Sequence, residues 1–201
     1  MSAPARQTVV LFSGLPYTGK TAIIHRLQDV LPGEAIHVDV HFRDIVAEDE
    51  VCLDRWLEEN PRLVERIVDH IRSVPADRYY VEIGIMRKKH RRYLIEWSRN
   101  AGYDVLPVLL ECHSRATIAA RQEARMQALA LSPEKQKIAI DLDELYGPID
   151  SAFEKIEASE GYHVVDTSRP IDVCVNRIVK LIETNGTSGV TDCGTTEIQT
   201  R

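Results

Sequence analysis

Residues 8–21 have the sequence T-V-V-L-F-S-G-L-P-Y-T-G-K-T, and this segment decides the fold. Its second part, residues 14–21, matches the pattern G-x-x-x-x-G-K-[ST], in which each fixed residue has a physical task. The two glycines let the backbone curl until its N–H groups point inward at a phosphate chain. The lysine supplies a point charge for the outer phosphates, and the hydroxyl of the last residue can ligate Mg²⁺. The segment therefore predicts a phosphate-binding loop.

The residues on either side support this interpretation. Residues 8–12 form an apolar, β-branched run that is typical of a buried parallel strand. Residues 21–31 place apolar side chains at helical spacing. A strand, a glycine-containing loop and a helix N-terminus in this order form an anion site, and ATP with Mg²⁺ is the expected ligand. The residues predicted to bind the nucleotide are Gly14, Leu15, Pro16, Tyr17, Thr18, Gly19, Lys20 and Thr21.

Composition restricts the class of protein. A chain of 201 residues is long enough for one domain with a good core. The net charge of -6 argues against broad binding to nucleic acid, although a local basic groove could still hold a nucleic-acid end. No stretch approaches the roughly 20 apolar residues of a membrane span, and residues 1–6 are too short and polar for a signal peptide. The four cysteines form no C-x-x-C pair and indicate buried, reduced thiols in a cytoplasmic protein.

Strand and helix patterns alternate along the chain. Strands are expected over residues 8–12, 34–38, 78–85, 104–112 and 162–166. Helices are expected over residues 21–31, 49–73 with a break at Pro61, 88–101, 114–130 with Ser114 as the cap, and 170–184. This alternation predicts an α/β fold, a five-stranded parallel sheet with helices on both faces. We expect one domain over residues 1–184 and a disordered tail over residues 185–201, which lack periodicity.

Two carboxylates are candidates for chemistry, because ligands of open α/β sheets lie beyond the carboxyl ends of the strands. Asp39 follows the second strand and can accept the proton of a hydroxyl that attacks the γ-phosphate. The alternative is that Asp39 only caps a helix beginning near His41. Glu82 interrupts an apolar strand, where it can hold Mg²⁺ through water together with Thr21, or can simply pair with an arginine. Glu111, at the end of the fourth strand, is the second candidate for the metal.

Arg121 and Arg125 lie four residues apart on one helix face, directly before a polar stretch that extends to about residue 150. Two guanidinium groups can close over the charge of a transferred phosphate, or can form a solvated basic face. The functional interpretation predicts a lid over residues 121–146. The basic run at residues 87–92 indicates a solvated helix start, and it would attract an anionic substrate if it faced the site.

Taken together, these residues resemble those of the adenylate-kinase-like P-loop kinases, over residues 7–184. The closest branch is that of polynucleotide 5′-kinase, chloramphenicol phosphotransferase and the zeta toxins. The resemblance implies that Asp39 and Arg43 are base and substrate clamp, and that Glu82 is the acidic residue of the third strand. It also implies that Arg121 and Arg125 stand at the start of the lid segment.

The same resemblance implies that the turn after the fifth strand borders the adenine through Thr167 and Ser168. The expected function is a P-loop kinase in which Lys20, Asp39, Arg121 and Arg125 transfer the γ-phosphoryl of ATP to a hydroxyl. The acceptor is a small molecule or the end of a nucleic acid, and the sequence does not identify it. The alternative is a regulatory P-loop ATPase without an acceptor, which would not need Asp39 as a base.

Overall fold

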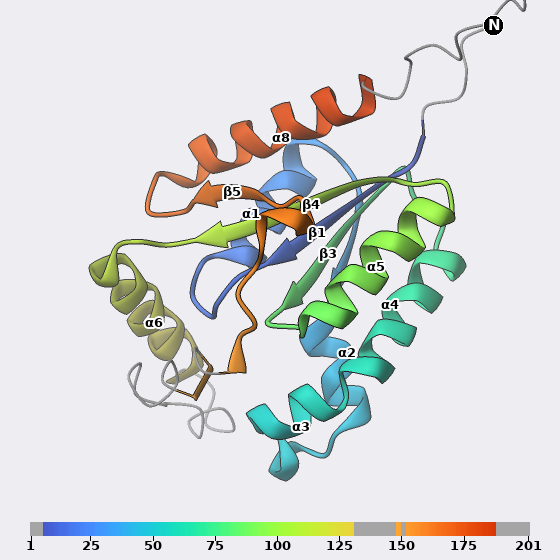
Figure 1. The fold of residues 1–201 in the computed structure, drawn as a ribbon. Helices are drawn as coiled ribbons and strands as arrows, with labels where there is room; N and C mark the ends of the chain where they lie inside the picture. Colours follow the sequence, from blue (N-terminus) through green and yellow to red (C-terminus); the bar gives the residue numbers. More distant parts are fainter. Residues whose placement is uncertain (1–5, 131–147, 150–151, 188–201) are drawn as a thin grey trace, which may run out of the picture.

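The computed structural model describes residues 6–130, 148–149 and 152–187. Its five strands form one sheet in the order β2-β3-β1-β4-β5, and all neighbouring strands are parallel (Figure 1). The strands are β1 (Thr8–Ser13), β2 (Glu34–His37), β3 (Arg78–Gly84), β4 (Asp104–Glu111) and β5 (His163–Asp166). The α/β fold and the five-stranded parallel sheet predicted from the sequence are therefore confirmed.

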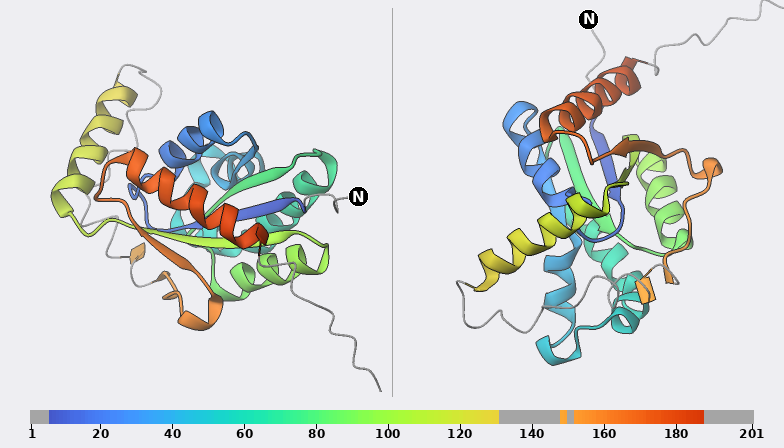
Figure 2. Two further views of the ribbon diagram at one scale, coloured as in Figure 1. Left: turned by 90° about the horizontal axis from the view of Figure 1, so that it is seen from above. Right: turned by 90° about the vertical axis from the view of Figure 1, so that its left-hand side faces the viewer.

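Helices cover both faces of this sheet (Figures 1 and 2). The α-helices are α1 (Lys20–Val30), α2 (Val38–Ile45), α3 (Leu53–Glu58), α4 (Asn60–Ser73), α5 (Lys88–Asn100), α6 (Arg115–Ala130) and α8 (Ile171–Thr187). Two 3₁₀ turns, η1 (Glu48–Glu50) and η3 (Ala158–Glu160), complete the described elements. Helices α1 and α8 lie on one face, and α2, α4 and α5 lie on the other.

The central strand β1 shows why the chain folds this way. Its apolar residues are fully buried, and successive side chains point to opposite faces of the sheet. Val9 and Leu11 enter the core beneath α4 and α5, whereas Val10 and Phe12 enter the core beneath α1 and α8. A strand buried on both faces has no polar side, which explains the unbroken apolar run in the sequence.

The segment after β2 differs from the prediction. The strand ends at His37, and α2 begins at Val38, so Asp39 lies in the first turn of a helix and not at a strand tip. The helix is short, but it buries Val38 and Phe42 four residues apart on one face.

The expected break near Pro61 separates α3 from α4. Pro61 lies in the first turn of α4, where proline is well tolerated, so it stands at the start of the second helix.

The structure also differs from the expectations for the cysteines and for the end of the last helix. Cys174 is buried and Cys112 is half-buried, but Cys52 is exposed, so the expectation of buried thiols is wrong for Cys52. Helix α8 continues through residues 185–187, which the sequence assigned to the tail. Residues 131–146 of the expected lid and residues 188–201 lie outside the described residues. No helix in the described part of the chain is both long enough and apolar enough to cross a membrane.

A buried ion pair joins α5 to the segment that leads into β5. Arg91 is fully buried, and its Nε and Nη2 donate to the two carboxylate oxygens of Glu160, each at 3.0 Å. Its Nη1 donates to the carbonyl of Met86 at 2.7 Å. Nearby, Lys88 Nζ lies 2.6 Å from the carboxylate of Glu157. The basic run is therefore not a uniformly solvated surface, because Arg91 fixes η3 to the body of the domain.

We predict that Glu160→Leu lowers the free energy of unfolding by about 3–5 kcal/mol, because it leaves the Arg91 guanidinium buried without its counter-ion. The measurement is urea denaturation of wild type and variant. The matched control is Glu96→Leu, which removes an exposed partner of Arg92 on the same helix at 3.5 Å. That change should alter the free energy by no more than about 0.5 kcal/mol.

The double variant Arg91→Met with Glu160→Leu should recover most of the lost stability, since a buried ion pair can be replaced by apolar side chains of similar volume. Equal stability of the Glu160→Leu and Glu96→Leu variants would contradict the importance of the buried pair.

Candidate active site

The loop between β1 and α1 has the backbone geometry that its glycines predict. Gly14 has φ +145°, and a Cβ there would lie 2.5 Å from the carbonyl oxygen of Leu110 on β4, so no larger residue fits. Gly19 has φ +91° and directly precedes α1. The Ser13 hydroxyl donates to the carbonyl of Gly84 at 2.9 Å, which ties the start of the loop to the end of β3.

Lys20 lies inside this loop. Its Nζ donates to the carbonyl oxygens of Gly14 at 3.0 Å and Leu15 at 2.8 Å. The side chain is buried, and burial lowers the pKa of its ammonium group, although the negative charges of Glu82 and Asp39 oppose this shift. The lysine charge is thus held at the floor of the loop, beside two carboxylates.

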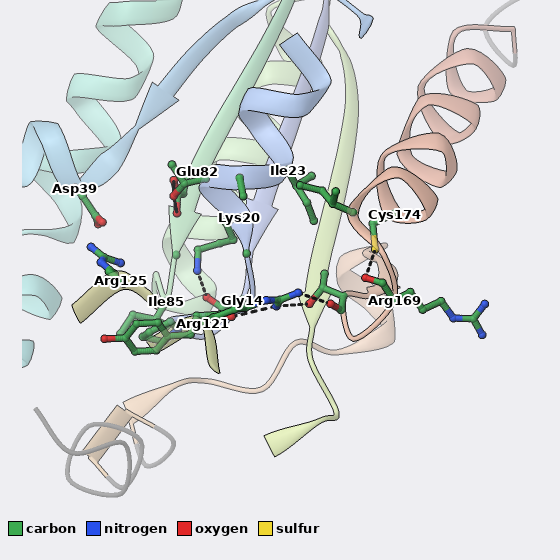
Figure 3. Close-up of a pocket in the computed structure, with 18 of the residues that line it drawn as sticks. Gly14, Lys20, Ile23, Asp39, Glu82, Ile85, Arg121, Arg125, Arg169 and Cys174 are labelled. Carbon is green, nitrogen blue, oxygen red and sulfur yellow. Dashed lines mark hydrogen bonds between the residues drawn. The ribbon is translucent and has the colours of Figure 1, made fainter. Parts of the chain in front are cut away.

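The loop opens into a cleft of about 700 Å³ at the carboxyl ends of the strands (Figure 3). Eleven of the residues predicted from sequence line it: Gly14, Pro16, Tyr17, Gly19, Lys20, Thr21, Asp39, Glu82, Arg121, Arg125 and Thr167. Leu15, Thr18, Arg43, Glu111 and Ser168 are not part of its lining. The lining also includes Trp56, Ile85, Arg169, Ile171 and Cys174, to which sequence reasoning assigned no role.

Glu82 is buried at the end of β3 and has two hydrogen-bond partners. The hydroxyl of Thr21 lies 3.3 Å from Oε1 and 3.1 Å from Oε2. Nδ1 of His37 lies 2.8 Å from Oε2. Burial alone would raise the pKa of Glu82, but the His37 hydrogen bond, the charge of Lys20 and the Thr21 hydroxyl together lower it. The hydrogen bond to Glu82 in turn raises the pKa of His37.

His37 is the residue of this cluster that sequence reasoning missed. It is the last residue of β2, and the register of the sheet pairs it with Glu82 on β3. The two positions are 45 residues apart in the chain. The sequence contains no local signal for this pairing, because it depends on β3 lying between β2 and β1.

Asp39 projects from the first turn of α2 toward the cleft (Figure 3). Loss of water around the carboxylate raises its pKa, and the negative charge of Glu82 adds to the increase. The charges of Lys20, Arg125 and Arg43 act in the opposite direction. Arg43 lies four residues after Asp39, on the same face of α2.

Arg121 and Arg125 hold α6 against the phosphate-binding loop. Arg121 Nη1 donates to the carbonyl of Tyr17 at 3.2 Å, and its Nη2 donates to the carbonyl of Thr167 at 2.5 Å. The Arg125 guanidinium lies over the Tyr17 ring, 5.9 Å from its centroid. Figure 2 shows α6 extending away from the sheet, and none of its described side chains is buried. The two arginines therefore supply much of its attachment to the domain.

The turn after β5 closes the other end of the cleft. The backbone N–H and hydroxyl of Thr167 donate to the carbonyl of Glu111 at 2.7 and 3.1 Å. The backbone N–H and hydroxyl of Ser168 donate to Asp166 and lower the pKa of that carboxyl. The Glu111 carboxylate lies 3.5 Å from His113, and Glu111 is not part of the cleft lining. Of the two candidate acids, Glu82 is thus the one beside the loop.

Thr21 and Glu82 fit the requirements of Mg²⁺. They offer a hydroxyl and a carboxylate within hydrogen-bond distance of each other, at the edge of the phosphate-binding loop. Both are hard oxygen donors, which Mg²⁺ prefers, and this ion is usually held by one or two carboxylates together with substrate phosphates. Glu111 offers no comparable arrangement.

Comparison by sequence identifies no relative. No protein-family model matches the chain, and no curated protein matches it.

Comparison by structure finds similar folds. A gluconokinase from Sinorhizobium meliloti 1021 has a TM-score of 0.62 and 16% identity, covering 92% of this chain and 99% of that chain. The APS kinase of Mycobacterium tuberculosis, in complex with AMPPNP and APS, has a TM-score of 0.61 and 18% identity, covering 90% and 99%. Shikimate kinase from Acinetobacter baumannii, in complex with shikimate, has a TM-score of 0.54 and 12% identity, covering 90% and 96%. The chain thus shares the fold of these three kinases over most of its length.

Proposed function

We propose that this protein is an ATP-dependent phosphotransferase that moves the γ-phosphoryl group of ATP to a hydroxyl of a small molecule or a nucleic-acid end. The observation that carries the proposal is one cleft that contains both a phosphate-binding loop with a buried lysine and the carboxylate of Asp39. The names of the three structural neighbours, all kinases, support phosphoryl transfer. The free thiols of Cys52, Cys112 and Cys174 fit a reducing compartment, and on that basis we propose a cytoplasmic location.

The cleft would hold the nucleotide along its length. Lys20 and the backbone N–H groups of the loop would bind the phosphates. At the other end Thr167, Ile171 and Cys174 would border the adenine. Ser168 follows Thr167 in the turn after β5. Thr21 and Glu82 would hold Mg²⁺, which when bound supplies positive charge that offsets the charge of the phosphates.

The proposed reaction transfers one group and one proton. The oxygen of the acceptor hydroxyl forms a bond to the γ-phosphorus, and the bond from that phosphorus to the β,γ-bridging oxygen breaks, which releases ADP. The hydroxyl proton passes to the carboxylate of Asp39. A raised pKa makes Asp39 a better proton acceptor than an ordinary aspartate. Arg121 and Arg125 would stabilise the charge that spreads over the transferred group.

The acceptor would enter beside Asp39. Trp56 and Ile85 line the cleft, and a Cβ on Gly84 would lie 3.6 Å from Cζ2 of Trp56. The indole ring of Trp56 offers apolar contact area for a small acceptor. Arg43, on the same helix face as Asp39, would serve as the substrate clamp at the entrance.

We predict that Asp39→Asn lowers kcat by roughly 10²- to 10⁴-fold while the affinity for ATP stays close to that of wild type, because an amide cannot accept the proton. The measurement is product mass after incubating ATP·Mg²⁺ with a panel of small hydroxyl compounds and nucleic-acid ends. In wild type, kcat should fall as the pH drops through the pKa of Asp39, which lies above its usual value of 3.8. This acidic limb should disappear in Asp39→Asn.

The control for nucleotide binding is Lys20→Ala. It removes a charge-assisted contact and should weaken ATP binding by about 1.5–3 kcal/mol in calorimetry. Equal affinity in both proteins would contradict the nucleotide site. ATP hydrolysis that needs no acceptor and is unaltered by Asp39→Asn would favour the alternative, a regulatory P-loop ATPase.

The proposed lid leads to a separate prediction about Arg121 and Arg125. We propose that the described part of the expected lid, residues 121–130 of α6, closes over bound ATP with Arg121 and Arg125 on the phosphates. Arg121→Ala and Arg125→Ala should each lower kcat, on the order of 10³-fold, more than they raise KM for ATP, because the guanidinium groups act mainly on transition-state charge. Steady-state kinetics measure both parameters.

The matched control is Glu123→Ala. Glu123 is exposed on the same helix and accepts a hydrogen bond only from Gln127 in the described structure. This variant should keep wild-type kinetics. If the two arginine variants also stayed within a few-fold of wild type, the arginines would only attach α6 to the phosphate-binding loop, and the lid would have to be abandoned.

A further inference from the structure

The carboxylate of Glu82, which lines the cleft, is bonded to His37. Nδ1 of His37 lies 2.8 Å from Oε2 of Glu82, and the side chains are 22% and 9% exposed. The bond joins the ends of two neighbouring strands, because the sheet register places these residues side by side. His37 thus reaches the carboxylate from the β2 side.

Thr21 reaches the same carboxylate from another direction. Its hydroxyl lies 3.1 Å from Oε2 and 3.3 Å from Oε1. Thr21 belongs to α1, so Glu82 is held between one strand and one helix. The Thr21 hydroxyl has one proton and two lone pairs, so it can donate to Glu82 and still offer its oxygen to a cation. His37 is the other side chain that donates to Glu82 in the described structure.

The imidazole of His37 is itself constrained. The ring of His25 packs against it edge-on, with centroids 5.6 Å apart and an interplanar angle of 80°. The bond to Glu82 requires a proton on Nδ1, since a carboxylate only accepts. A neutral ring with the proton on Nδ1 satisfies this requirement as well as a charged ring does. The hydrogen bond can therefore persist whether or not the ring carries a charge.

We propose that His37 is a positioning residue that orients the Glu82 carboxylate toward the divalent cation of the nucleotide site. The inference rests on the proposed function, in which Thr21 and Glu82 hold that cation. Carboxylates near metals depend on hydrogen bonds from a surrounding layer of residues, and loss of such a partner typically costs 10- to 100-fold in metal affinity. A residue that only stabilised the fold would not affect metal affinity selectively.

The test measures the affinity of Mn²⁺ for the ADP complex by electron paramagnetic resonance, in wild type, His37→Leu and His37→Asn. Leucine removes the donor, whereas asparagine can place an N–H close to the position of Nδ1. His37→Leu should lose roughly 10- to 100-fold in Mn²⁺ affinity. His37→Asn should stay within about threefold of wild type, since it retains a donor. Affinity for ADP in EDTA should be the same in all three proteins.

Wild-type protein supplies a second measurement that does not depend on whether the leucine variant folds. In ¹⁵N NMR spectra of the ADP complex, the His37 ring should show a protonated Nδ1. Its ¹⁵N shifts should change when Mg²⁺ is added, because the carboxylate that it contacts then faces a cation. Unchanged shifts would overturn the inference.

Two other results would overturn it as well. One is wild-type Mn²⁺ affinity in His37→Leu, and the other is an equal loss in His37→Leu and His37→Asn. In both cases wild type would still bind Mn²⁺ with ADP, so the proposed function would stand. Wild-type protein that bound no ADP at all would instead contradict the proposed function, and this inference with it.

Discussion

A carboxylate buried at the end of a central strand must have partners, and the partners of Glu82 explain much of the arrangement around the cleft. Its acceptor oxygens receive hydrogen bonds from β2 through His37 and from α1 through Thr21, while Lys20 contributes charge. These groups meet because β3 lies between β2 and β1 in the sheet. The strand order that builds the core therefore also builds the polar cluster beside the phosphate-binding loop.

The two carboxylates of the cleft show how environment separates similar groups. Glu82 has hydrogen-bond donors and a nearby ammonium, and its pKa is lowered. Asp39 has no comparable donors among the residues that the structure describes; loss of water and the charge of Glu82 raise its pKa. Opposite shifts in neighbouring acids are a common way to give one group a fixed charge and the other a proton-accepting task. The two proposed tasks, metal holding and base catalysis, match these directions.

Much of the fold could be predicted from the sequence because its signals are local. The glycine pattern at residues 14–21, the apolar run of β1 and the helical spacing after it all lie within a short window. Glu82 is a charged residue within an apolar strand, and Asp39 comes shortly after a strand, so both stand out in the sequence, and both line the cleft. The start of α2 was missed because a helix of eight residues gives little periodicity.

What could not be predicted depends on contacts between distant parts of the chain. The pairing of His37 with Glu82 requires the register of β2 on β3, and that of Arg91 with Glu160 spans 69 residues. The basic run around Arg91 resembles a solvated surface when only the sequence is considered. Trp56 and Cys174 were not expected in the cleft, because apolar residues at helical spacing are explained equally well by core packing.

The central place of β1 has a consequence for how the molecule opens. The strand is paired along both sides, and its apolar side chains are fully buried, so we expect its amide hydrogens to exchange only through near-global unfolding. Helix α6 has no buried side chain among those described and belongs to the part that can open alone. The phosphate-binding loop joins the first part, and Arg121 and Arg125 touch it from the second. We therefore expect local unfolding of α6 to break these contacts and to leave the backbone of the loop in place.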